Sequence, residues 1–287
     1  MKDSIRVFVA SVSCQLFALL GPLRQSRGAE MGYSLERPKQ TTTYMTDFIY
    51  DLVSAGQFSS TDKIFAHHYE HTYARHLERF RDQQNLGVLE IGYGSGCGVK
   101  FWTTVFPGCH LYCFDRDVEL IDNVNNTVIK VDQSDLGSLE AGIDKISRQI
   151  SIIVDDGSHM PAHQLTSLTF LFEGLLAQGG VYIIEDIETS YWRRGSIYGY
   201  SVAYGLHDPW STIEVLKLAV DYVNRRFLSP EDKSLIEYRL LAVGLDPATV
   251  QNFESIEFSR NCVVITKRSV DNLDDHNYPH QEAIRRF

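Results

Sequence analysis

This sequence lacks the features that mark nucleic-acid-binding and integral membrane proteins. It has 27 lysines and arginines against 37 aspartates and glutamates, a formal net charge of −10 at pH 7, so no overall basic field attracts a phosphate backbone. The apolar stretch from Val7 to Leu20 is shorter than the roughly 20 apolar residues of a spanning helix. We therefore expect no nucleic-acid partner and no integral membrane span after the N-terminal segment.

Cysteine is scarce, and its spacing fits neither a zinc site nor a disulfide framework. The cysteines are Cys14, Cys97, Cys109, Cys113 and Cys262, without the paired spacing of zinc ligands. Cys109 and Cys113 flank one expected strand, where four residues of extension separate their Cα atoms by roughly 13 Å. A disulfide needs about 7 Å or less, so we interpret the cysteines as structural.

The N-terminal segment resembles a secretory signal. Lys2 and Arg6 precede the apolar stretch, although no small-x-small cleavage site follows it. A frayed or amphipathic helix is the alternative. A signal would direct the protein to the secretory pathway or to a membrane, whereas without one we expect a cytoplasmic protein. We exclude residues 1–30 from the fold as a signal-like or flexible segment.

The rest of the chain suits one large α/β domain. Residues 31–86 have a helical pattern and form an expected cap, with helix starts at Thr41–Thr43 and Ser59–Asp62. After Asn85, short apolar runs alternate with longer helical segments, a pattern typical of βαβ units in a parallel sheet. The expected strands are Val88–Ile91, Leu111–Phe114, Val128–Val131, Ile150–Val154 and Val181–Ile184.

A hairpin is expected at the end of this domain. Ser255–Phe258 and Cys262–Ile265 flank Ser259-Arg260-Asn261, a turn between two apolar runs. Together with the five parallel strands, they predict a doubly wound, Rossmann-like sheet of seven strands, mostly parallel and closed by an antiparallel hairpin. We assign residues 87–268 to this domain and residues 269–287 to a polar tail.

A glycine-rich turn directly follows the first expected strand. It runs Glu90-Ile91-Gly92-Tyr93-Gly94-Ser95-Gly96, so its backbone can approach a ligand closely. The dinucleotide fingerprint G-x-G-x-x-G would need a third glycine where the chain has Cys97 or Val99. The spacing E-x-G-x-G-x-G instead resembles the motif of class I methyltransferases, which bind S-adenosylmethionine. A nicotinamide-dependent oxidoreductase and a non-catalytic module that binds S-adenosylmethionine stay open as alternatives.

Acidic and polar residues follow the next strands, where such a cofactor is held. The carboxylate of Glu90 can interact with the methyl donor, because the donor carries a positively charged sulfonium and ammonium group. Asp115 ends the second strand, where a carboxylate accepts both ribose hydroxyls. By the same resemblance, Asp132-Gln133-Ser134 recognise the adenine ring. The expected cofactor-binding residues so far are Glu90, Gly92, Gly94, Gly96, Asp115, Asp132, Gln133 and Ser134.

Two acidic clusters follow the fourth and fifth strands. They are Asp155-Asp156-Gly157-Ser158-His159 and Glu185-Asp186, and both face the crevice at the carboxyl ends of the strands. Their carboxylates can offer oxygen ligands to a hard cation such as Mg²⁺. His159 is close enough in sequence to act beside that cation. Each cluster alone also suits a turn or a helix N-terminus.

The clusters resemble those of the sugar O-methyltransferases of macrolide biosynthesis and of related cephalosporin hydroxylase-like proteins. The resemblance extends from about Thr61 to Lys267 and includes three further segments. These are Thr61-Asp62-Lys63, His67-x-Tyr69 with Tyr73, and Thr189-Ser190-Tyr191-Trp192. The loop after Trp192 departs from the family pattern and is expected to shape the acceptor pocket.

This resemblance implies roles for the site residues. Asp156, Glu185 and Asp186 are expected to bind Mg²⁺, and Lys63 to belong to the cofactor site. His159 is expected to be the general base, with Asp156 as a second catalytic residue. The expected reaction is methyl transfer from S-adenosylmethionine to a hydroxyl of a small-molecule acceptor such as a glycoside. Residues 87–268 are then the methyltransferase domain, and a homo-oligomer is an expected assembly.

Overall fold

The computed structural model describes residues 46–269 of the chain. The signal-like segment, the helix start at Thr41–Thr43 and the polar tail from residue 270 lie outside the described residues. Within the described range, no helix combines the length and the apolar character needed to cross a membrane.

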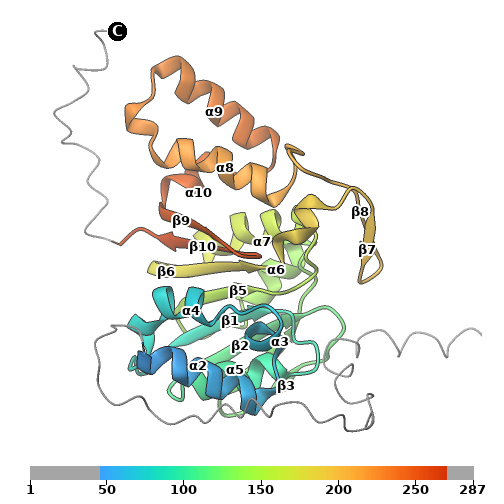
Figure 1. Ribbon diagram of the computed structural model, residues 1–287, viewed down its shortest axis with the longest axis vertical. Helices are drawn as coiled ribbons and strands as arrows, with labels where there is room; N and C mark the ends of the chain where they lie inside the picture. Colours follow the sequence, from blue (N-terminus) through green and yellow to red (C-terminus); the bar gives the residue numbers. More distant parts are fainter. Residues whose placement is uncertain (1–45, 270–287) are drawn as a thin grey trace, which may run out of the picture.

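A mostly parallel sheet forms the centre of the molecule (Figure 1). Its parallel strands are β1 (Gly87–Ile91), β2 (His110–Asp115), β4 (Asn126–Lys130), β5 (Ile150–Asp155) and β6 (Leu176–Glu185). All five were predicted from apolar runs. Because β1 lies between β2 and β5, the chain winds in both directions from the centre. The doubly wound fold class is therefore confirmed.

The predicted C-terminal hairpin closes this sheet. Strands β9 (Phe253–Ser259) and β10 (Cys262–Lys267) pair antiparallel, and β10 also pairs antiparallel with β6. The seven predicted strands are thus present. An eighth, β3 (Ile121–Asp122), adds two residues antiparallel to β4, too few to form an apolar run. The full order is β3-β4-β2-β1-β5-β6-β10-β9.

Helices cover both faces of the sheet, because alternate strand residues point to opposite faces. One face carries α2 (Thr46–Ser59), α3 (Asp62–Phe65), α4 (Glu70–Leu77) and α5 (Cys97–Val105), as Figure 1 shows. The other carries α6 (Leu136–Ile143), α7 (Pro161–Gly174), α8 (Thr212–Val223), α9 (Pro230–Ala242) and α10 (Pro247–Gln251). The 3₁₀ helices are η1 (Glu78–Phe80), η2 (Ile187–Tyr191) and η3 (Arg225–Phe227).

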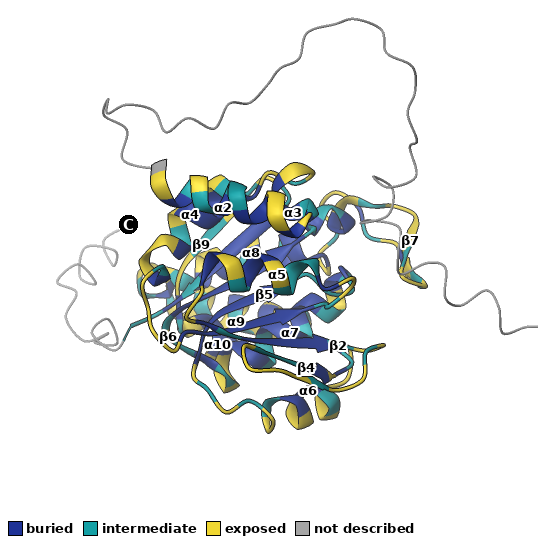
Figure 2. Cartoon of the chain, turned by 90° about the horizontal axis from the view of Figure 1, so that it is seen from below, coloured by how far each residue is buried: buried dark blue, intermediate teal, exposed yellow. Residues whose placement is uncertain are grey.

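The helices before β1 are part of the core. Phe48 and Leu52 of α2 and Tyr73 of α4 are completely buried in one hydrophobic cluster with Val88 and Val154 of the sheet. Figure 2 shows buried strands enclosed by helices whose outer faces are exposed. The segment predicted as a cap therefore supplies, together with α5, one of the two apolar layers that bury the sheet.

A small hairpin projects from the body after η2 (Figure 2). It consists of β7 (Gly195–Ile197) and β8 (Tyr200–Val202), which pair antiparallel in a separate two-stranded sheet. This hairpin forms most of the loop that follows Trp192.

Candidate active site

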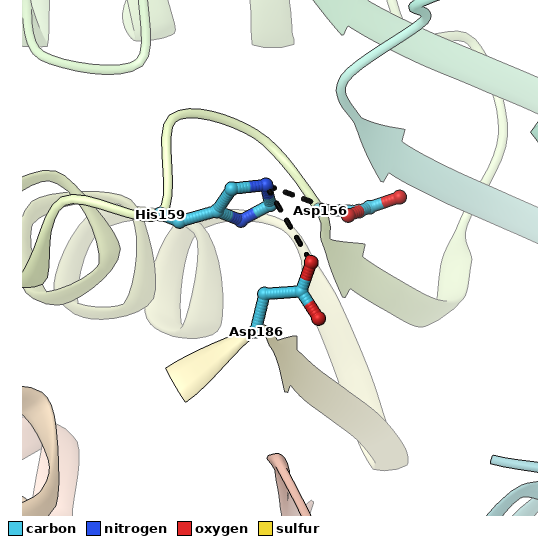
Figure 3. A group of neighbouring side chains, drawn as sticks. All are labelled: Asp156, His159 and Asp186. Atoms are coloured by element: carbon cyan, nitrogen blue, oxygen red, sulfur yellow. Dashed lines mark ion pairs between the residues drawn. The ribbon is translucent and has the colours of Figure 1, made fainter. Parts of the chain in front are cut away.

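Three of the predicted groups meet at the carboxyl ends of β5 and β6 (Figure 3). Asp156 follows β5, Asp186 follows β6, and His159 lies just before α7. Nε2 of His159 lies 4.0 Å from Oδ1 of Asp156 and 3.8 Å from Oδ2 of Asp186. One ligand atom from each residue lies within 4.8 Å of the others. Two hard carboxylate oxygens and an imidazole at this spacing suit a divalent cation.

Backbone geometry holds the group in place. His159 and Asp186 have φ values of 54° and 52°, in the left-handed region that non-glycine residues rarely adopt. The hydroxyl of Thr189 donates a 2.6 Å hydrogen bond to the carbonyl of His159. The imidazole is only 4% exposed, and Nδ1 has no hydrogen-bond partner among the described residues. Strained, tightly held residues of this kind concentrate at functional sites.

Glu185, the third predicted metal ligand, stands behind this group. Its Oε2 accepts a 2.9 Å hydrogen bond from Nζ of Lys63, and its Oε1 accepts one from the hydroxyl of Tyr73. Burial raises the pKa of Glu185 well above its ordinary value, although the charge of Lys63 opposes the shift. Within the described range, His159 rather than Glu185 thus lies together with the two aspartates.

Lys63 joins three carboxylates from three different strand ends. Its Nζ lies 2.5 Å from Asp156, 2.9 Å from Glu185 and 3.2 Å from Glu90. Burial by itself lowers the pKa of Lys63, but the three carboxylates outweigh it, so the pKa is well above its ordinary value. The lysine predicted for the cofactor site therefore lies among the acidic residues as a buried cation.

The glycine turn lies directly against the acidic cluster. Gly92, Gly94 and Gly96 have φ values of 100°, 50° and 80°, a conformation that favours glycine. A Cβ at Gly92 would lie 2.2 Å from the carbonyl oxygen of Asp156, whereas a Cβ at Gly94 would meet nothing within 4 Å. The turn therefore packs against Asp156 on one side and opens to free space on the other.

Two predicted cofactor carboxylates flank this turn. Glu90 is almost completely buried, and its Oε1 accepts a 3.0 Å hydrogen bond from Nε1 of Trp102. Burial raises its pKa. Asp115 is partly exposed, and its two oxygens accept hydrogen bonds from the N–H groups of Tyr93 at 2.9 Å and Asp117 at 2.8 Å. Asp115 thus shapes the turn, and Glu90 lies beneath it.

The predicted adenine-recognising residues separate into two kinds. Gln133 is buried, donates to both oxygens of Asp155 at 2.7 and 2.8 Å, and accepts from the N–H of Ser158 at 3.0 Å. Asp132 is partly exposed and accepts from both the N–H and the hydroxyl of the exposed Ser134. The amide of Gln133 is therefore committed to the protein, and Asp132 and Ser134 are the accessible members.

Two further residues hold Asp186, and neither was among the predicted site residues. The hydroxyl of Tyr69 donates to Oδ1 of Asp186 at 2.7 Å, and Nδ2 of Asn261 donates to the same oxygen at 3.0 Å. Nδ1 of His67 lies 3.4 Å from it. Tyr69 belongs to a segment shared with the resembled family, and that shared segment could have indicated a role for it. Asn261 lies in a turn, where asparagine is common for conformational reasons alone.

Known proteins with related sequences are sugar O-methyltransferases, although no family model matches the chain. It is 35% identical over 217 residues to the 8-demethyl-8-alpha-L-rhamnosyl tetracenomycin-C 2'-O-methyltransferase of Streptomyces olivaceus, covering 73% of this chain and 52% of the relative. It is 37% identical over 139 residues to the mycinamicin VI 2''-O-methyltransferase of Micromonospora griseorubida, covering 45% of this chain and 33% of the relative. The chain therefore spans about half or less of the length of these curated relatives.

Solved structures give the same relation. The MycE methyltransferase of the mycinamycin biosynthetic pathway, in complex with Mg, SAH and mycinamycin VI, matches with a TM-score of 0.62 and 26% identity, over 79% of this chain and 57% of that chain. The same enzyme with Mg and SAH matches with a TM-score of 0.63 and 26% identity, over 82% and 59%.

Proposed function

We propose that this chain is an S-adenosylmethionine-dependent methyltransferase related to the macrolide sugar O-methyltransferases, and that it transfers a methyl group from S-adenosylmethionine to a hydroxyl of a small molecule. The proposed acceptor class is a glycoside with a free sugar hydroxyl. The relatives supporting it are named for methylation of sugar hydroxyls. The fold and the motif order support the methyl donor.

The observation that carries this proposal is the contact between the glycine turn and Asp156. Gly92 approaches the Asp156 backbone too closely for any side chain, so a donor bound at the turn lies beside the acidic cluster. Displacement at the methyl carbon needs the donor and the acceptor oxygen aligned at close range. The contact supplies that proximity.

The cluster fits a divalent cation, and we propose that Asp156 and Asp186 hold Mg²⁺ or a similar ion, with the predicted Glu185 as third carboxylate. A cation at this place supplies positive charge that favours an ionised acceptor oxygen. Each oxygen of Glu185 already accepts a hydrogen bond, one from Lys63 and one from Tyr73, and keeps a second lone pair for a cation. Lys63 balances the negative charge of Glu90, Asp156 and Glu185, and Tyr69 and Asn261 orient Asp186.

His159 is the proposed general base. An alcohol is a weak nucleophile at neutral pH, and an imidazole can remove its proton as the new bond forms. Nε2 of His159 faces both aspartates, so the proposed base lies directly beside the proposed cation site. The buried position excludes bulk water from the proton acceptor.

The donor site is proposed to consist of the glycine turn and its neighbours. Gly94 borders free space, and Asp115 lies at the rim of the turn. We keep Lys63, Glu90, Gly92, Gly96, Asp132, Gln133 and Ser134 in this site as predicted. For Gln133, Lys63 and Glu90 the contacts support an indirect role, because their side chains bond to protein groups.

An activity panel tests the proposal. The full chain is incubated with Mg²⁺ and S-adenosylmethionine labelled on the methyl group, with mycinamicin VI, simple rhamnosides and phenols as acceptors. We expect label in a product only when an acceptor is present and the Mg²⁺ has not been chelated. Donor bound but never consumed would favour a non-catalytic module. Calorimetric binding of NAD without binding of the methyl donor would favour an oxidoreductase, an alternative to which the related proteins give no support.

A further inference from the structure

We propose that Tyr198, at the tip of the β7–β8 hairpin, positions the acceptor against His159 and thereby determines acceptor specificity. The inference rests on the proposed function. Sequence reasoning expected the loop after Trp192 to shape the acceptor pocket but singled out no residue there.

The first observation is an unfavourable residue in the turn. Tyr198 and Gly199 connect β7 to β8 with φ values of 47° and 84°, both positive, as in a type I′ turn. Asparagine or aspartate followed by glycine suits such a turn, because these residues tolerate the left-handed conformation. A bulky tyrosine at the first position is strained there. A strained residue that the surrounding structure keeps in place points to a function for its side chain.

The second observation is where that side chain lies. The ring of Tyr198 is centred 5.6 Å from the ring of His159, tilted by 47°. It is half exposed, whereas His159 is almost fully buried. The phenol therefore covers the imidazole on one side and presents its remaining surface outward. A tyrosine offers an apolar face and a hydroxyl in one rigid side chain, which suits a sugar ring with C–H and O–H groups.

The third observation is that the hairpin is anchored independently of Tyr198. On the other side of Gly199, the hydroxyl of Tyr200 accepts a hydrogen bond from Arg116, whose guanidinium carbon lies 5.4 Å from the centre of the Tyr200 ring. The same ring meets His163 edge-on, with 4.9 Å between ring centres. Arg116 directly follows Asp115 of the donor site. The tip of the hairpin thus lies between the donor site and the proposed base, and Tyr198 can be changed without removing its anchor.

The test compares Tyr198→Asn with the wild-type full chain. Asparagine suits the turn, so we expect an unchanged or higher melting temperature and unchanged affinity for S-adenosylhomocysteine. With the glycoside that the wild type methylates fastest, we expect KM for the acceptor to rise at least tenfold, while kcat falls by less. Tyr198→Phe, which keeps the ring, should raise KM by a smaller factor. The matched control is Tyr238→Asn on the exposed surface of α9, where Tyr238 is 71% exposed and both constants should stay within twofold.

Three results would contradict the inference. A folded Tyr198→Asn variant whose acceptor KM stays within twofold of wild type would remove Tyr198 from the acceptor site. A fall in kcat alone, with unchanged KM, would assign the residue to the chemistry of His159 instead. Absence of methylation by the wild type on the whole panel would overturn the proposed function and this inference together. Failure of the inference alone differs from this, because the wild type would then still methylate an acceptor.

Discussion

A single buried lysine balances the charge of the candidate site. Lys63 is 2% exposed and contacts carboxylates at the ends of β1, β5 and β6. Lys63→Met would leave at least Glu90 and Glu185 buried without their cation. Breaking buried pairs in this way costs about 3–5 kcal/mol. We expect the free energy of unfolding, measured by urea denaturation, to fall by that order, and Lys100→Met, at an exposed position of α5, to change it little. A loss below about 1 kcal/mol would show that Lys63 carries little of the charge balance.

The roles of ligand and base predict different responses to Mg²⁺. Asp156→Ala removes a proposed ligand, so turnover should fall and excess Mg²⁺ should restore part of it. His159→Ala removes the proposed base, so turnover should stay about 10²- to 10⁴-fold low at saturating Mg²⁺, with donor affinity unchanged. Steady-state kinetics over a Mg²⁺ titration measures both. Partial rescue of His159→Ala by Mg²⁺ would instead make His159 a ligand, which its spacing to Asp156 and Asp186 also allows.

The sequence predicted the residues of the site better than their contacts. Asp156, Glu185 and Asp186 were predicted to converge, with His159 beside them, since parallel strands end at one edge of the sheet. The structure instead groups His159 with the two aspartates. The hydrogen bond from Trp102 to Glu90 and the bonds from Gln133 to Asp155 could not be foreseen. Each of these depends on which of several nearby polar groups a side chain reaches once it is buried, and that choice is set by packing in three dimensions rather than by spacing along the chain.

At the scale of elements, the C-terminal hairpin closes the sheet and also makes hydrogen bonds to the candidate site. Asn261 donates to Asp186 and accepts from the N–H of Glu188. Its own φ is 55°, so Asn261→Gly should keep the turn and remove only these side-chain bonds. A hydrogen bond to a charged group contributes about 1.5–3 kcal/mol, so we expect kcat to fall at least tenfold.

The melting temperature of Asn261→Gly, measured by calorimetry, should change by only a few degrees. Asn85→Gly is the matched control, because Asn85 is also left-handed but lies in the exposed loop before β1. Its activity should stay at the wild-type level. If Asn261→Gly keeps full activity while remaining folded, Asn261 has no part in orienting Asp186.

Elements were predictable where their apolar pattern was long enough to be distinctive. The parallel strands have at least five residues each, and their continuous apolar runs matched burial on both faces. The two-residue β3 has no such run. The helices before β1 were predicted, but their place in the core was not. The sequence of a helix shows which of its faces is apolar, but it does not show which element packs against that face.

At the scale of the whole molecule, an ion pair joins the first helices to the last hairpin. Glu257 of β9 accepts hydrogen bonds from Arg75 and from His76 of α4, the latter at 2.9 Å. Burial alone would raise the pKa of Glu257, but the bonds from Arg75, His76 and Ser259 outweigh it and lower the pKa to about 2.

This shift predicts how stability depends on pH. The pKa of Glu257 is lower in the folded chain than the ordinary value of 4.5, so its stabilising contribution is fully present above about pH 4.5 and is lost as the pH falls toward 2. Glu257→Gln should therefore flatten the fall of melting temperature between pH 5 and pH 2, as thermal scans across that range can measure. Glu140→Gln, at an exposed position of α6, serves as control. Equal slopes for wild type and Glu257→Gln would contradict the assignment.

The position of Asn261 also bears on the order in which a growing chain can build this site. The glycine turn and the carboxylates of β5 and β6 leave the ribosome well before residue 261. Asp186, however, is fixed by the side chain of Asn261 and by Tyr69, whose hydroxyl oxygen also lies 3.0 Å from the carbonyl oxygen of Asn261. During synthesis the nascent sheet therefore carries its acidic residues before their arrangement is complete. The proposed cation site gains its full set of contacts only when the last hairpin pairs with β6, so we expect cation binding to depend on completion of the domain.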